Sequence, residues 1–180
     1  ITCDAHKWLA VPMGCGMFFC RHADTVAQAF RTQTTYMPGV QSGGASDPLA
    51  TSIQWSRRFI GLKLFMALAE QGEAGYAAMI DRQVELGELL RELLNRSGWR
   101  VMNETPLPLV CFTRDGLDIP KLLSAMRERQ TAWMSSAEIR GTPVIRACIT
   151  SFRTTRDDIR WVVDEITKLA ISESVVRSAH

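Results

Sequence analysis

The sequence predicts an α/β protein whose C-terminal half is a small domain with a largely antiparallel sheet. Three observations support this fold class. Short apolar runs bounded by glycine, typical of strands, occupy the first 20 residues. Two long stretches between residues 48 and 96 carry apolar residues at three- and four-residue spacing, which indicates helices. After residue 98 the pattern becomes strand–strand–helix–strand–strand–helix, as in a sheet covered by helices on one side.

Composition is that of a globular protein with a real core, since 46% of the 180 residues are hydrophobic and 22% are charged. The 21 basic and 19 acidic residues are well mixed and give a net charge of +2, which argues against nucleic acid or an anionic membrane as the main partner. No apolar run approaches the roughly 20 residues that span a bilayer, and no secretory signal is present. The sequence therefore predicts a cytoplasmic protein without a membrane span.

Five cysteines form no CxxC pair and no metal-type group with the three histidines. Their odd number and apolar surroundings favour free, buried thiols in a reducing cytoplasm over disulfides, and no metal site is predicted. The chain begins with Ile1 rather than methionine, inside a run that already has strand character. We therefore expect a C-terminal segment of a longer protein.

The pattern of the N-terminal region predicts the end of a sheet. Residues 1–4 predict a strand end, followed by a loop that carries His6 and Lys7. A glycine-bounded turn then leads into the continuous apolar run Met17–Cys20, which is typical of a buried strand in a parallel or mixed sheet. Residues 22–30 predict a short helix.

Residues 31–52 predict a long loop of about twenty residues, rich in glycine, proline and hydroxyl side chains. Asp47-Pro48 then offers an N-cap and a first-turn proline, predicting a helix that runs to about Gln71 and is stopped by Gly72. This helix is apolar nearly all round, so we expect it to be buried on most faces. A second long helix follows and ends at Ser97-Gly98.

Beyond Gly98 the pattern predicts four strands and two helices. The strands are expected at 99–102, 107–113, 131–138 and 144–151, with a turn at 140–143 joining the last two. One helix is capped by Asp118 and runs to about Arg129. The last helix begins with Thr154 and Asp157 in a capping-box pattern.

Lys7 is the first candidate for chemistry. A lysine that follows a strand is usually a solvated surface charge. If Trp8 and Phe18 partly excluded water from it, the amine would lose its proton more readily and could carry out Schiff-base chemistry. Strand ends of open α/β sheets are also where ligands bind. The residues alone leave both interpretations open.

Three other features have two interpretations each. Tyr36 is either a proton donor on a closing loop or an ordinary buried loop residue. Ser56-Arg57-Arg58 is either part of a phosphate site at a helix start or a salt-bridged basic face. If the helix starts at Pro48, these residues lie beyond its first turn, where no free backbone N–H groups remain to bind a phosphate. Arg146, in an apolar strand, either faces solvent or binds a carboxylate.

Taken in this order, the pieces resemble the group II pyridoxal-phosphate-dependent amino acid decarboxylases, which include aromatic-L-amino-acid, glutamate and diaminobutyrate decarboxylases. The resemblance spans essentially all 180 residues. The matching stretches are Asp4-Ala5-His6-Lys7-Trp8-Leu9, Cys15-Gly16-Met17-Phe18-Phe19, Thr35-Tyr36, Ser56-Arg57-Arg58-Phe59 with Leu62-Lys63-Leu64, Leu109-Val110-Cys111-Phe112, and Val144-Ile145-Arg146-Ala147.

The resemblance implies the C-terminal part of a fold-type I enzyme that depends on pyridoxal phosphate, and three parts within it. Residues 1–52 would form the end of the cofactor-binding large domain, with an active-site loop at 31–52. Residues 53–97 would be connecting long helices, and residues 98–180 a small α/β domain. The implied reaction is decarboxylation of an L-amino acid to its amine with release of carbon dioxide.

The resemblance also implies roles for four residues. Lys7 would form the Schiff base with pyridoxal phosphate, and His6 would lie beside it near the phosphate. Tyr36 would protonate the carbanion carbon after carbon dioxide leaves. Ser56 would meet the cofactor phosphate of the partner subunit, which implies a homodimer with sites at the subunit interface.

Asp4-Ala5 departs from the Asn-Pro of many family members, and an aspartate there would repel a phosphate, so Asp4 is not assigned as a phosphate ligand. The family's ring-stacking histidine and the aspartate that pairs with the ring nitrogen lie upstream of the lysine. Two alternatives stay open. One is another lysine–Schiff-base enzyme of the same fold, such as an aminotransferase, lyase or desulfurase. The other is a non-catalytic dimerisation module.

Overall fold

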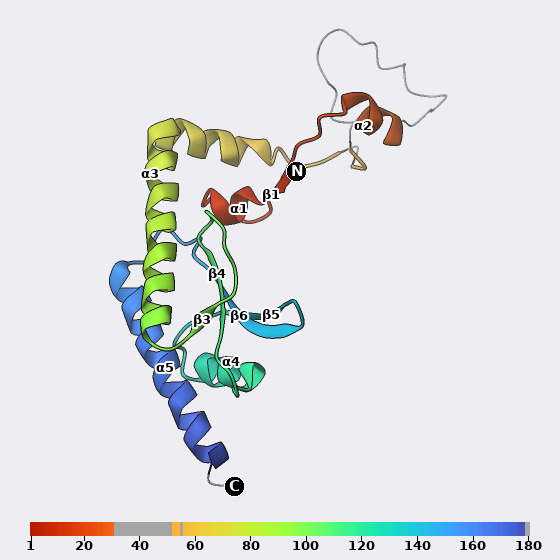
Figure 1. The fold of residues 1–180 in the computed structure, drawn as a ribbon. Helices are drawn as coiled ribbons and strands as arrows, with labels where there is room; N and C mark the ends of the chain where they lie inside the picture. Colours follow the sequence, from red (N-terminus) through yellow and green to blue (C-terminus); the bar gives the residue numbers. More distant parts are fainter. Residues whose placement is uncertain (31–51, 55, 179–180) are drawn as a thin grey trace, which may run out of the picture. The chain divides into compact units, whose positions relative to one another are not determined.

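The computed structural model describes residues 1–30, 52–54 and 56–178 (Figure 1). They group into two compact units, one ending at Gly72 and the other beginning at Glu73. The predicted division at residues 52 and 97 stays a prediction, because residues that pack together do not by themselves define the domains of a whole protein.

The first unit begins with a two-stranded antiparallel sheet, in which β1 (Thr2–Cys3) pairs with β2 (Met17–Phe18). The expectation of a buried strand in a parallel or mixed sheet was wrong: β2 pairs antiparallel with β1, and Phe18 is 65% exposed. A short apolar run has the same appearance in a doubly covered strand and in a small hairpin, so periodicity could not separate them. The short helix predicted at 22–30 is confirmed as α2 (Ala23–Ala29).

A one-turn helix, α1 (Ala5–Trp8), stands where the sequence predicted a loop. The Asp4 carbonyl accepts hydrogen bonds from the backbone N–H groups of Lys7 and Trp8, at 2.9 and 3.0 Å. These bonds close the turn immediately after β1. The prediction of a loop was wrong because a four-residue helix is too short to show a helical period in the sequence.

The long helix α3 (Gly61–Arg96) is interrupted at Gly72, whose φ of 65° and ψ of 177° are not helical. The predicted stop at Gly72 is therefore confirmed, at a backbone conformation that favours glycine. The predicted start at Pro48 lies outside the described residues, but the expectation that residues 56–60 are helical was wrong. Their side chains are exposed, so no packed face offsets the cost of forming a helical turn there.

The first part of α3, before Gly72, is more exposed than the sequence predicted. Phe65, Met66 and Leu68 are all exposed, whereas burial on most faces was expected. Within the described residues, Leu64 and Ala67 are the positions of this helix that pack against the small apolar cluster of the first unit. The expectation of general burial was wrong for the described residues, because only one side of this helix meets other side chains of its unit.

The second unit contains a four-stranded antiparallel sheet in the order β3-β4-β6-β5. Its elements are β3 (Arg100–Val101), β4 (Leu109–Thr113), α4 (Ile119–Glu128), β5 (Ser135–Ile139), β6 (Thr142–Cys148) and α5 (Arg156–Ser178). This confirms the predicted succession strand–strand–helix–strand–strand–helix. The β5–β6 turn consists of Arg140 and Gly141, both with positive φ (51° and 76°), which suits a tight hairpin.

The core of the second unit lies on one face of this sheet. Val110 and Phe112 of β4 and Ile145 of β6 belong to a buried cluster that also contains residues of α3, α4 and α5. Figure 1 shows where these strands and helices lie. Because side chains alternate along a strand, Cys111 and its cross-strand partner Arg146 belong to the opposite face. Arg146 is exposed there, which favours the solvent-facing alternative.

Helix caps of the second unit lie close to their predicted positions. Asp118 Oδ1 accepts from Lys121 N at 3.1 Å, which confirms the predicted cap of α4. The capping box of α5 lies one residue later than predicted, with Thr155 N donating to Asp158 Oδ2 at 2.8 Å and Asp158 N donating to Thr155 Oγ1 at 3.2 Å. The sequence offers two overlapping Thr-x-x-Asp patterns, and the first was chosen wrongly because α5 begins at Arg156.

Replacing Thr155 by alanine (T155A) should lower the free energy of unfolding by about 1 kcal/mol, because the capping hydroxyl is lost. The same exchange at Thr154 is the matched control and should have a smaller effect. Hydrogen bonds from Thr155 hold the pKa of Asp158 below its ordinary value of 3.8. The stabilisation should therefore be complete above that pH and be lost as the pH falls through the lowered pKa. Urea unfolding at several pH values measures both effects, and an equal loss in T154A would contradict the assignment.

All five cysteines, which lie in the described residues, are free thiols, as predicted, but only Cys15 and Cys111 are buried. Burial raises the pKa of Cys111, opposed by the nearby Arg146 and Arg91. Cys20 is exposed, so the prediction that the thiols are buried was wrong for this residue. Within the described part of the chain, no helix has the length and apolar character needed to cross a membrane.

Candidate functional site

The candidate site is built on α1, the single helical turn that follows β1. The consecutive residues His6 and Lys7 lie in this turn, directly after the end of β1. Lys7 Nζ donates to Asp4 Oδ2 at 2.6 Å, and the Lys7 side chain is 59% exposed. Within the described residues the lysine is therefore solvated and paired, as in the first of the two interpretations that the sequence left open, and shielding by Trp8 and Phe18 stays a prediction.

Asp4 is the charged neighbour of the lysine. The hydrogen bond from Lys7 lowers the pKa of the Asp4 carboxyl group below its ordinary value. Desolvation opposes this shift, and the charges of Lys7 and His6 add to it. Asp4 Oδ1 also lies close to Gly16, since a Cβ atom added to this glycine would be 3.5 Å from it. The carboxylate thus holds the ammonium group close to the start of α1, and it is exposed enough to release it.

His6 is fixed by a single backbone carbonyl. The oxygen of Cys15 accepts the backbone N–H of His6 at 3.1 Å and lies 2.9 Å from His6 Nδ1. A carbonyl oxygen can only accept, so Nδ1 must carry a proton in this arrangement. In the neutral ring, Nε2 is then the acceptor nitrogen. This contact could not be predicted from the sequence, because it depends on how the chain returns from α1 to β2.

Beneath α1 lies a small cluster that fixes this return. Ala5, Val11 and Cys15 are buried together, and Leu64 and Ala67 of α3 pack against them. A polar contact joins the same two segments. Lys63 Nζ donates to the carbonyl oxygens of Met13 at 2.6 Å and Pro12 at 3.3 Å. In the sequence, Lys63 is only a basic residue between two leucines, so this contact was not predicted.

The remaining candidates are not brought together with Lys7. Ser56, Arg57 and Arg58 are exposed and precede α3, which begins at Gly61, so they do not lie within a helix as expected. In the described part of the chain, no hydrogen bond joins Ser56 to His6 or Lys7. Tyr36 lies outside the described residues.

The residues present fit an aldehyde cofactor that carries a phosphate. Such a cofactor needs an accessible amine to bind covalently, and the exposed Nζ of Lys7 provides one. It also needs ring contacts nearby, and His6 presents a ring whose orientation is fixed by Cys15. The carboxylate of Asp4 argues against a phosphate directly beside it, as the sequence predicted.

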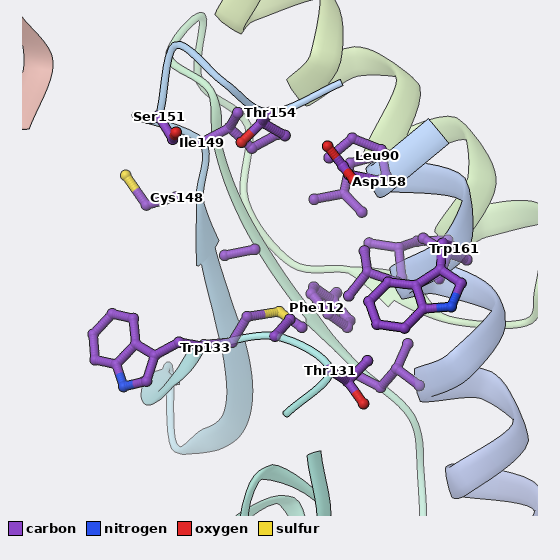
Figure 2. Close-up of a pocket in the computed structure, with 18 of the residues that line it drawn as sticks. Leu90, Phe112, Thr131, Trp133, Cys148, Ile149, Ser151, Thr154, Asp158 and Trp161 are labelled. Carbon is purple, nitrogen blue, oxygen red and sulfur yellow. The ribbon is translucent and has the colours of Figure 1, made fainter. Parts of the chain in front are cut away.

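A separate cavity of about 350 Å³ lies entirely in the second unit. Phe112 lies between Trp133 and Trp161, which come from opposite sides of it (Figure 2). Asp158 is the one charged residue among the described residues that line this cavity, and its carboxylate is already engaged with Thr155. None of the site residues predicted from the sequence lines it.

The chain is similar in sequence to proteins named as amino acid decarboxylases. It is 26% identical to the aromatic-L-amino-acid decarboxylase of Bacillus atrophaeus over 188 residues, which covers 97% of this chain and 39% of that relative. It is 30% identical to the histidine decarboxylase of Drosophila melanogaster over 162 residues, covering 88% of this chain and 19% of that relative. The chain thus spans well under half the length of these relatives.

Solved structures show the same fold. The chain superposes on a crystal structure of Oryza sativa TDC with PLP and tryptamine at a TM-score of 0.84 and 20% sequence identity, covering 96% of this chain and 38% of that one. This likeness confirms the predicted fold class. The family model described as the pyridoxal-dependent decarboxylase conserved domain matches residues 1–114, more than half of the 180 residues. The chain therefore belongs to the pyridoxal-dependent decarboxylase family.

Proposed function

We propose that the protein to which this chain belongs uses pyridoxal phosphate to decarboxylate an L-amino acid to its amine. The observation that carries the proposal is the exposed Lys7 amine on α1, next to a His6 ring fixed by Cys15, in a chain of this family. The names of its relatives support an amino acid as the substrate.

Pyridoxal phosphate, when bound, supplies an electron sink for the negative charge left on Cα when carbon dioxide departs. Lys7 would hold the cofactor through its amine, once Asp4 has released the side chain and the ammonium group has lost a proton to solvent. The hydrogen bond from Nδ1–H to the Cys15 carbonyl orients the His6 ring and leaves Nε2 available as an acceptor. Tyr36 donates its phenolic proton to Cα.

We further propose a cytoplasmic homodimer in which Ser56 reaches the cofactor phosphate of the other subunit. Exposed apolar side chains next to Ser56 and on the first part of α3 support this, since Phe59 is 77% and Phe65 is 65% exposed. Apolar side chains grouped in this way are typical of surfaces that another chain covers. The five free thiols support a reducing compartment.

The test is to reduce the intact protein with borohydride in the presence of pyridoxal phosphate and to map the labelled peptide. We expect the label on the peptide that contains Lys7, together with release of carbon dioxide from an amino acid substrate. A label absent from that peptide would contradict the enzyme and favour a non-catalytic module. Transfer of the amino group without carbon dioxide would instead identify an aminotransferase.

Replacing Tyr36 by phenylalanine (Y36F) should slow amine formation by roughly a hundredfold, because the proton donor is lost. The bond between the cofactor and the Lys7 amine should not be affected. The measurement compares amine production with borohydride labelling of the Lys7 peptide in the same sample. Unchanged turnover would remove Tyr36 from the mechanism. Loss of labelling would indicate a role in cofactor binding instead.

A further inference from the structure

Lys63 connects α3 to the turn that leads into β2. Its ammonium group donates to the Met13 oxygen at 2.6 Å and to the Pro12 oxygen at 3.3 Å, so one cation holds two successive carbonyls. Gly14 follows at once with a φ of +82°, and the position of its Cβ would lie 4.0 Å from Lys63 Nζ. A hydrogen bond from a charged donor is stronger than one between neutral groups.

This turn ends at the atom that fixes His6. Cys15 comes directly after Gly14, and its carbonyl accepts both the backbone N–H and the Nδ1–H of His6. The Cys15 side chain is buried with Ala5 at the start of α1, beneath Leu64 of α3. The path from Lys63 to Lys7 thus consists of one cation, one short turn and one shared carbonyl.

We infer that Lys63 is a positioning residue, which holds the 12–15 turn so that the Cys15 carbonyl locks the ring of His6 beside Lys7. The role in catalysis rests on the proposed function, whereas the role in fixing His6 does not. Lys63 acts through the backbone and touches neither His6 nor Lys7 within the described hydrogen bonds and ion pairs. Its apolar stem is interchangeable with that of methionine, but its three N–H donors are not.

The test uses the intact protein with Lys63 replaced by methionine (K63M), and by arginine (K63R) as the conservative exchange. In K63M the His6 amide should exchange its hydrogen roughly tenfold faster, since a hydrogen bond from a charged donor no longer restrains the turn. The ring-nitrogen chemical shifts of His6 should move from one tautomer towards a mixture. K63R should restore both values to within about threefold, because a guanidinium also donates to two carbonyls.

Two controls separate positioning from general loss of structure. Exchange of the buried Phe112 amide in the second unit should not change in K63M. The exposed Lys121 of α4, replaced by methionine, should leave His6 unaltered. Unchanged His6 exchange and ring shifts in K63M would overturn the inference, and so would changes that K63R fails to reverse.

Cofactor binding gives a second, distinguishable result. In K63M we expect pyridoxal phosphate to bind about tenfold more weakly, by titration of its absorbance, if a fixed His6 contributes to its binding. Failure of the unaltered protein to label at Lys7 would overturn the proposed function, while His6 exchange would still decide the positioning role. If the unaltered protein is labelled at Lys7 and K63M binds the cofactor with equal affinity, Lys63 only fixes the position of His6. That result would overturn its link to catalysis.

Discussion

Replacement of Lys7 by arginine (K7R) should abolish borohydride labelling and reduce decarboxylation by roughly a thousandfold or more. Arginine keeps the positive charge and can still pair with Asp4, but its guanidinium does not lose a proton near neutral pH and cannot attack an aldehyde. The folded state should not change, because the Lys7 side chain is 59% exposed. Carbon dioxide release and peptide mapping on the intact protein measure the two effects.

The matched control for K7R is the same exchange at Lys121, an exposed lysine of α4, which should leave both measurements unchanged. Asp4 offers a second comparison. With asparagine at position 4 (D4N), the ammonium group loses its charged partner, and labelling should persist. Full activity in K7R would place the essential amine elsewhere and would reduce Lys7 to a surface charge paired with Asp4.

Replacement of Phe112 by alanine (F112A) should lower the free energy of unfolding of the second unit by about 3–5 kcal/mol. Phe112 is 1% exposed and forms an edge-to-face pair with Trp99, with ring centroids 5.3 Å apart and planes at 86°. Trp99 is itself fixed, since its Nε1 donates to Thr167 Oγ1 at 2.9 Å. The neighbours therefore cannot close the space that the lost ring leaves, and the existing cavity beside Phe112 would grow.

Urea unfolding followed by tryptophan fluorescence measures the effect of F112A. The matched control is Phe152, which is 56% exposed, where the same exchange should change stability by no more than about 0.5 kcal/mol. Equal losses for the two variants would show that exposure in the structure does not predict the energetic role of these rings. A loss below about 1 kcal/mol in F112A would show that the core relaxes around the gap.

Much of the second unit could be predicted from the sequence. The run Leu109–Thr113 is recognisable as a strand because it is a short, continuous apolar segment, buried along nearly all of its length. The segment after Asp118 has a helical pattern because α4 buries one face. The first unit was harder to predict, because its strands have two residues each and α1 has four. Periods of two and of 3.6 residues cannot be recognised in segments so short.

The candidate site was predictable where side chains themselves carry the chemistry. The pair His6–Lys7 is visible in the sequence, and the structure places it at a strand end. The contacts that fix the pair were not visible, since the Cys15 carbonyl and the Met13 carbonyl are backbone atoms that any residue could provide. The exposure of Lys7 was one of two interpretations that the sequence left open, because it depends on where Trp8 and Phe18 point.

The two hydrogen bonds that meet at the Cys15 carbonyl have a consequence for the direction in which the His6 ring faces. One oxygen accepts from the backbone N–H and from the Nδ1–H of the same residue, so a single atom orients both the main chain and the ring of His6. The direction of Nε2 is therefore set by the backbone of the 12–15 turn, and no neighbouring side chain is needed to aim it.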